Sequence, residues 1–136
     1  MTAVFVDTSF YIALVNPGDA LHNAAAELGR RTRGQSVTTE YVLVEVGNYL
    51  ARTANKPLFL HLLRELEADP ETSIVPSAHD LFEEGTRLYA QRLDKDWSLT
   101  DCISFVIMNE RELTDALTAD RHFGQAGFIP LLNTDA

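Results

Sequence analysis

Short apolar segments alternate with longer amphipathic ones along the whole chain, and this alternation constrains the fold more than any other feature of the sequence. Five segments have the length and apolar character of buried strands: 3–6, 36–39, 72–75, 116–118 and 129–132. Helical patterns separate most of them, at 10–14, 20–33, 40–50, 57–66, 77–89 and 98–108. Because consecutive parallel strands need a crossover connection, the sequence predicts an α/β fold with a central, mainly parallel sheet.

Residues that favour helix N-termini precede the last two of these helices. Ser77 followed by Asp80 resembles a capping box and predicts the start of the fifth helix. Ser98 or Thr100 caps the sixth helix, and Asp101 fits as the acidic member of a capping box begun at Ser98. Such boxes are frequent local signals without chemical content, so Asp101 has a purely structural explanation.

The chain has 136 residues, a common size for one domain, and we expect a single domain over residues 1–136. Its one cysteine, Cys102, cannot form an internal disulfide and is typical of a reducing compartment. No apolar run approaches the roughly 18 residues of a membrane span, and no basic segment precedes the first strand. These features predict a cytoplasmic protein.

Acidic residues outnumber basic ones by 20 to 11, which gives a formal net charge of -9. This balance argues against a nucleic-acid-binding protein that relies on an overall positive field. Two features reduce the conflict with a role on RNA. Bound cations would neutralise a cluster of acids, and three arginines lie close together at 30, 31 and 33.

Asp7 and Asp120 each follow a predicted strand directly. Ligands of open parallel sheets bind beyond the carboxyl ends of the strands, and both residues fall on that edge. Each also has an ordinary explanation as a helix N-cap, which for a single aspartate is the more frequent role.

Glu45 is harder to explain structurally, because it lies in the apolar run 41–46 with no obvious cation nearby in the sequence. A buried carboxylate must be partnered, and several converging carboxylates repel one another unless a cation lies between them. The four acids Asp7, Glu45, Asp101 and Asp120 therefore make electrostatic sense together mainly as a metal site. Ligation by oxygen alone favours Mg²⁺ or Mn²⁺ over zinc.

Other reactive side chains are weaker candidates. The four histidines lack the mutual spacing of zinc ligands, and we expect structural roles for them. Cys102 fits a small buried residue better than a nucleophile, and Trp97 fits partial burial better than stacking on a base. No glycine-rich phosphate loop is present.

Four sequence motifs occur in order along nearly the whole chain: V-F-V-D-T-S from residue 4, T-E-Y-V-L-V-E-V from 39, D-W-S-L-T-D-C from 96 and L-T-A-D-R-H-F from 117. Together they resemble the PIN-domain nucleases, in particular the VapC-type toxins of toxin–antitoxin pairs. The resemblance implies a three-layer α/β/α domain and a metal-dependent endoribonuclease that hydrolyses single-stranded or looped RNA with a metal-activated water.

The resemblance also assigns roles to residues of this chain. Asp7 and Asp101 are the first choice for direct contact with Mg²⁺ or Mn²⁺, while Glu45 and Asp120 bind a second ion or hold waters. A further group near the motifs is expected to orient ligands or water: Thr8, Ser9, Asp96, Ser98 and Thr118.

The expected partners are RNA, a cognate antitoxin and a second copy of the chain, as in VapC-like homodimers. In that family an antitoxin helix packs into a groove and brings a basic side chain to the acidic site. The segment Leu58–Leu66 is a candidate for part of that groove, although packing in the core is its plainer role.

Two alternative functions remain open from the sequence. One is a PIN-like module that binds RNA or protein without cutting it. The other is a phosphohydrolase with Asp7 as its nucleophile. The usual pattern of such enzymes has a second aspartate two residues later, where this chain has Ser9.

Overall fold

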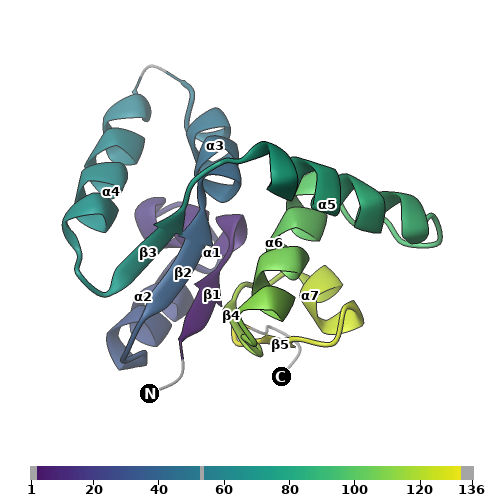
Figure 1. The fold of residues 1–136 in the computed structure, drawn as a ribbon. Helices are drawn as coiled ribbons and strands as arrows, with labels where there is room; N and C mark the ends of the chain where they lie inside the picture. The colour runs from purple at the N-terminus through teal and green to yellow at the C-terminus, as the bar shows by residue number, and fades with distance from the viewer. Residues whose placement is uncertain (1–2, 53, 133–136) are drawn as a thin grey trace.

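One sheet of five parallel strands forms the centre of the molecule (Figure 1). The computed structural model describes residues 3–52 and 54–132; the rest of the predicted domain 1–136 lies outside the described residues. The strands are β1 (Val4–Val6), β2 (Ser36–Thr39), β3 (Thr72–Val75), β4 (Asp115–Leu117) and β5 (Ile129–Pro130). Their order is β3-β2-β1-β4-β5, so the predicted parallel sheet is confirmed.

Helices cover both faces of this sheet. They are α1 (Thr8–Val15), α2 (His22–Arg31), α3 (Glu40–Tyr49), α4 (Lys56–Ala68), α5 (His79–Gln91), α6 (Leu99–Glu110) and α7 (Arg121–Gln125). The first four pack against one another, as do the last three, and Figure 1 shows the two groups on either side of the sheet; α3 and α6 are in contact between the groups. The strands β1, β2 and β3 are added in turn toward one edge of the sheet, and after β3 the chain returns to add β4 and β5 toward the other edge. Because crossovers between parallel strands are right-handed, the two groups of helices lie on opposite faces. Within the described ranges, none of these helices has the length and apolar character needed to cross a membrane.

Three phenylalanines join the second helix group to the central strand. Phe5 on β1, Phe105 on α6 and Phe123 on α7 are fully buried. The ring centroid of Phe123 lies 4.9 Å from that of Phe105 and 6.2 Å from that of Phe5. Each such aromatic pair contributes about 1 kcal/mol beyond the area that it buries. This cluster fixes α6 and α7 against β1.

The start of α5 differs from the sequence-based expectation. Ala78, not Ser77, is the N-cap of α5, and no side chain caps this helix. The predicted capping box of Ser77 and Asp80 is therefore wrong. Both the backbone N–H and the hydroxyl of Ser77 donate to Glu40 Oε1, at 2.6 and 3.0 Å. The hydroxyl is used to tie the β3–α5 connection to α3.

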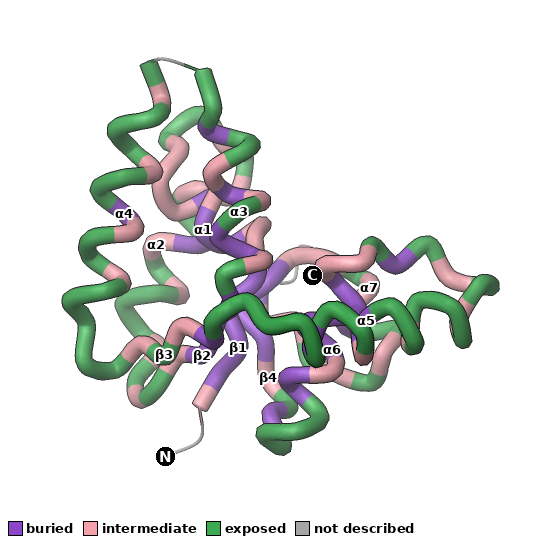
Figure 2. The backbone as a smooth tube through the Cα atoms, turned by 45° about the horizontal axis from the view of Figure 1, so that its top comes forward, coloured by how far each residue is buried: buried purple, intermediate pink, exposed green. Residues whose placement is uncertain are grey.

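Helix α4 is less buried than its leucine-rich sequence suggests. Figure 2 shows most of this helix exposed. Leu62 is its one buried residue, while Leu58 is 39% and Leu60 50% exposed. The expectation of core packing for 58–66 therefore holds for only one face of the helix.

Helices α5 and α6 approach each other closely at Gly85. A methyl group at this position would overlap Cγ1 of Ile103 and lie 3.4 Å from its backbone Cα. Since Gly85 and Ile103 are both buried, the neighbouring side chain has little room to move. Gly85 therefore permits the packing of α6, the helix that carries Asp101.

We expect Gly85→Ala to lower the free energy of unfolding by about 1–3 kcal/mol through overpacking, although alanine is the better helix former. Thermal and urea denaturation of the purified protein measure this change. Gly29→Ala in α2 is the matched control, because its new methyl group meets only Phe10 at an ordinary 3.6 Å. Equal stability of the two variants would contradict the proposed close approach.

Candidate metal centre

Asp7 lies at the point where the order of the sheet reverses. It follows β1 directly, and its backbone N–H donates to Leu117 O at the end of the neighbouring strand β4, at 3.1 Å. From β1 the chain continues to β2, which lies on one side of β1. The strand on the other side of β1 is β4, which follows β3 in the chain. Crevices at such positions are the usual ligand sites of open α/β sheets.

The Thr118 hydroxyl connects the two strand ends. It donates to Asp7 Oδ2 at 2.9 Å and accepts from the backbone N–H of Asp120 at 3.0 Å. Its single proton is used by Asp7, so the Ser9 hydroxyl, 3.0 Å away, is the donor to Thr118. Ser9 in turn accepts from the Ala119 N–H at 3.3 Å. The predicted orienting roles of Ser9 and Thr118 agree with these contacts.

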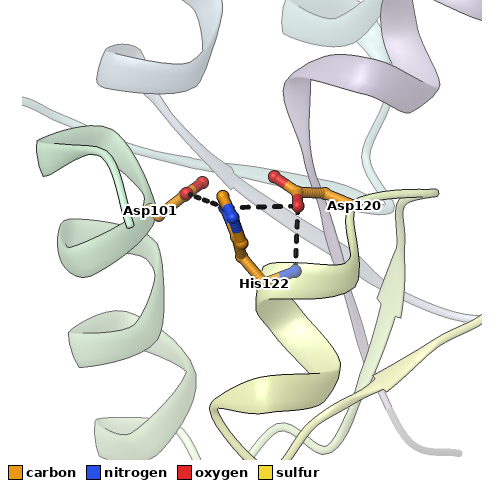
Figure 3. A group of neighbouring side chains, drawn as sticks. All are labelled: Asp101, Asp120 and His122. Carbon is orange, nitrogen blue, oxygen red and sulfur yellow. Dashed lines mark hydrogen bonds and ion pairs between the residues drawn. The ribbon is translucent and has the colours of Figure 1, made fainter. Parts of the chain in front are cut away.

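Asp101 is the acidic member of a capping box and also lies next to other potential metal ligands. The Ser98 N–H donates to Asp101 Oδ2 at 3.1 Å and the Asp101 N–H donates to Ser98 Oγ at 3.0 Å, which completes the capping box. The same carboxylate lies beside Asp120 and His122, and one ligand atom from each of the three residues lies within 4.8 Å of the others (Figure 3). A helix cap therefore also positions a potential metal ligand.

His122 is the residue that the sequence argument missed. Its Nδ1 lies 3.1 Å from Asp101 Oδ2 and 3.4 Å from Asp120 Oδ1. Its backbone N–H donates to Asp120 Oδ1 at 2.9 Å, because Asp120 is the N-cap of α7. The spacing reveals only part of this: a histidine two residues after a capping aspartate lies in the first turn of the helix beside that carboxylate, whereas the contact of His122 with Asp101 depends on tertiary packing.

Glu45 enters the site from α3 through a different contact. The Thr8 hydroxyl donates to Glu45 Oε1 at 2.6 Å, which places this half-buried carboxylate beside the residue after Asp7. Its partner is thus a hydroxyl group. Neither Glu45 nor Asp7 belongs to the group of three whose ligand atoms lie within 4.8 Å of one another.

Asp96 is the predicted site residue with the weakest link to the others. It is exposed and lines a cavity beside Ser98. Among the described residues, no hydrogen bond joins it to the four acids.

Burial and the repulsion of neighbouring carboxylates disfavour the charged forms of Asp7 and Asp101. Burial raises the pKa of Asp7 from 3.8 to about 7; the charges of Asp101 and Asp120 add to this effect, and the hydrogen bond from Thr118 opposes it. The pKa of Asp101 is also raised, first by burial and then by Asp120, against the contacts from Ser98 and His122. Asp7 is only 4% exposed and Asp101 7%.

Little positive charge lies near these acids to compensate their negative charge. In the described part of the chain, no lysine or arginine pairs with Asp7, Asp101 or Asp120, and His122 is the only basic side chain among them. Buried carboxylates without a cation are unfavourable, and a divalent ion beside Asp101 and Asp120 would offset their charges. The donor set thus fits a metal ion bound mainly by oxygen, with one ring nitrogen at hand.

Comparison with known proteins agrees with this geometry. The family model of the PIN domain matches residues 4–129. The 23S rRNA-specific endonuclease VapC20 of Mycobacterium tuberculosis is 30% identical over 129 residues, which cover 93% of this chain and 95% of that protein.

Solved structures share the fold. The crystal structure of Mycobacterium tuberculosis VapC20, a Sarcin-Ricin loop cleaving toxin, has a TM-score of 0.87 at 26% identity and covers 94% of this chain and 98% of its own. FitAcB from Neisseria gonorrhoeae has a TM-score of 0.64 at 18% identity, over 93% and 94% of the two chains. VapBC2 from Rickettsia felis, bound to a promoter DNA fragment, has a TM-score of 0.65 at 12% identity, over 95% and 97%.

The last two similarities concern the fold alone. The family model and the relative at 30% identity each extend over nearly the whole chain. The chain therefore belongs to the PIN-domain family, among its VapC-type members.

Proposed function

We propose that this protein is a metal-dependent endoribonuclease and the toxin of a type II toxin–antitoxin pair. The observation that carries the proposal is the convergence of Asp7, Asp101 and Asp120 at one sheet edge without a lysine or arginine partner among the described residues. The VapC20 relative is an endonuclease specific for 23S rRNA, which makes RNA the substrate to test first.

Each acidic residue has a role in the proposal. Asp7 and Asp101 hold Mg²⁺ or Mn²⁺ directly, and Glu45 and Asp120 hold a second ion or orient waters. His122 stays hydrogen-bonded to Asp101 and keeps that carboxylate in place. When bound, the ion would lower the pKa of a bound water and offset charge on the phosphate oxygens. Hydrolysis of the RNA would then leave 5′-phosphate and 3′-hydroxyl ends.

The hydroxyl groups around the acids orient them. The Thr118 hydroxyl, itself bonded to Ser9, holds Asp7, and the Thr8 hydroxyl holds Glu45, while the backbone N–H of Ser98 holds the Asp101 carboxylate. With these partners in place, the side chains are ordered before the substrate arrives, which reduces the reorganisation needed for catalysis.

We propose that an antitoxin helix inhibits the protein and that this helix binds in a groove between α3 and α4. This groove has a volume of about 340 Å³, and its apolar lining includes Leu43, Val44, Phe59 and Leu63. Val44 is 59% exposed and precedes Glu45, so a basic side chain after the docked helix would face the acidic centre.

Three further features are proposed: a homodimer from the family resemblance, a cytoplasmic location from the single cysteine and the hydropathy, and a single domain over 1–136 from the length of the chain. A solution mass equal to that of one chain by light scattering would contradict the dimer.

We expect Asp7→Asn and Asp101→Asn each to lower RNA cleavage at least about 100-fold, because loss of a supporting group alone costs 10- to 100-fold in such sites. The assay uses 23S rRNA and purified protein in Mg²⁺ or Mn²⁺, with 5′ ends mapped by sequencing. Asp80→Asn is the control, an exposed acid at the start of α5 with the same charge change. Cleavage retained by Asp7→Asn would contradict the assignment.

Stability without metal should depend on pH through Asp7. The folded protein keeps this proton up to about pH 7, whereas the unfolded chain loses it near 3.8, so this contribution is complete below pH 4 and is lost as pH rises through 7. A shift of this size corresponds to about 4 kcal/mol. Asp7→Asn should therefore gain stability over the wild type from pH 5 to pH 8.

Urea denaturation in a chelator, repeated with Mn²⁺, measures this effect. Because the ion competes with the proton, Mn²⁺ should raise the Tm of the wild type more at pH 8 than at pH 6, and that of Asp7→Asn little at either. A rise in Tm that is independent of pH would exclude ion binding at Asp7.

We expect Val44→Asp to weaken inhibition by the cognate antitoxin about tenfold, because a charge in the apolar groove must be desolvated. The probe is the cognate antitoxin protein, titrated into the RNA cleavage assay. Leu60→Asp is the control, since Leu60 is 50% exposed on α4 and does not line the groove. Equal inhibition of both variants would place the antitoxin elsewhere.

A further inference from the structure

A cavity of about 380 Å³ lies next to the metal centre, outside the group of acids. It is formed by the end of α5, the connection to α6 and the first turn of α6; Figure 1 shows this connection at the outer end of α5. Ser98 lines the cavity and is also bonded to the backbone and the carboxylate of Asp101. The hydrogen bonds of Ser98 therefore join the wall of the cavity directly to Asp101, a proposed metal ligand.

The cavity combines cations with aromatic rings. Arg92, Lys95, Tyr89 and Trp97 all line it. The guanidinium carbon of Arg92 lies 4.9 Å from the ring centroid of Trp97, a cation–π contact. Planar cations and aromatic rings are the groups on which proteins stack the bases of single-stranded RNA.

Trp97 gives this arrangement a rigid base. It is 6% exposed, its Nε1 donates to Gln125 Oε1 at 3.0 Å, and its ring meets Phe105 edge-on at 5.0 Å. Arg92 is held over it by two bonds of 3.0 Å to the carboxylate of Asp94. Trp97 is thus more buried than the partial burial expected from the sequence, and its ring forms part of the cavity wall.

Lys95 is the cation left to meet a phosphate. No carboxylate of the described residues lies within salt-bridge distance of it. The arginines near residue 31, which the sequence offered as the basic patch, do not serve this site. Arg30 and Arg31 pair with Glu27, and they end α2 just before β2 begins, at the opposite edge of the sheet from Asp7.

We propose that this cavity binds one nucleotide of the RNA strand next to the scissile phosphate. Lys95 pairs with its phosphate, Tyr89 and Arg92 stack on its base, and the exposed carboxylate of Asp96 accepts a hydrogen bond from a ribose hydroxyl or an amino group of the base. The proposal rests on the proposed ribonuclease function and adds to it the determinant of strand binding. It also gives Asp96 a role in the cavity.

The test is binding of a short single-stranded RNA in a chelator, where metal-dependent cleavage does not proceed, measured by fluorescence anisotropy over a range of salt concentrations. Lys95→Gln should weaken binding about tenfold at low salt and reduce the salt slope by about 0.7, the value for one phosphate contact on a single strand. Tyr89→Ala should weaken binding about tenfold with an unchanged slope. In cleavage assays both variants should raise KM more than they lower kcat.

Matched controls separate this cavity from general effects of charge and size. Arg64→Gln on α4 makes the same charge change, and Tyr49→Ala on α3 removes another exposed tyrosine. If Lys95→Gln and Arg64→Gln lose affinity equally, or if the wild type does not bind the RNA, the nucleotide site is overturned. Binding that depends on Lys95 without any cleavage by the wild type would support the cavity and overturn only the ribonuclease function.

Discussion

Repulsion among buried carboxylates is the constraint that the rest of this structure has to overcome. The charges of Asp101 and Asp120 disfavour ionisation of Asp7, that of Asp120 disfavours ionisation of Asp101, and no lysine or arginine of the described chain pairs with any of the three. Packing of the apolar core beneath these acids supplies the free energy that opposes their repulsion. Phe5, Phe105 and Phe123 lie two, four and three residues from these acids, so their contacts hold the three charges together. A site kept at the expense of stability is typical of enzymes.

The acids come from both helix groups of the fold. Asp7 and Glu45 belong to the side of β1, α1 and α3, whereas Asp101, Asp120 and His122 belong to the side of α6 and α7. The hydrogen bond from the Thr118 hydroxyl to Asp7 joins the two sides. Because the centre is assembled where the sheet reverses its order, its geometry depends on how the two groups pack rather than on any one loop.

Much of this could be predicted from the sequence, because the informative signals were local. The strand ends located Asp7 and Asp120, and the capping pattern located Asp101 at a helix start. His122 could not be found in this way, since its contact with Asp101 depends on where Phe123 anchors α7. Ser77 was misassigned because Glu40, 37 residues earlier, competes for its hydroxyl. The exposure of α4 likewise depends on neighbours that no periodicity reveals.

The hydrogen bonds around the acids also bear on which ion can be accepted. Oδ2 of Asp7 is engaged by Thr118, Oδ2 of Asp101 by Ser98 and His122, and Oδ1 of Asp120 by the His122 N–H. Each carboxylate thus retains one oxygen outside these bonds. Calcium commonly takes both oxygens of a carboxylate in a large, irregular shell, whereas magnesium takes single oxygens and keeps several waters. An ion bound here would meet one unengaged oxygen from each carboxylate, a ligand arrangement closer to that of magnesium than to that of calcium.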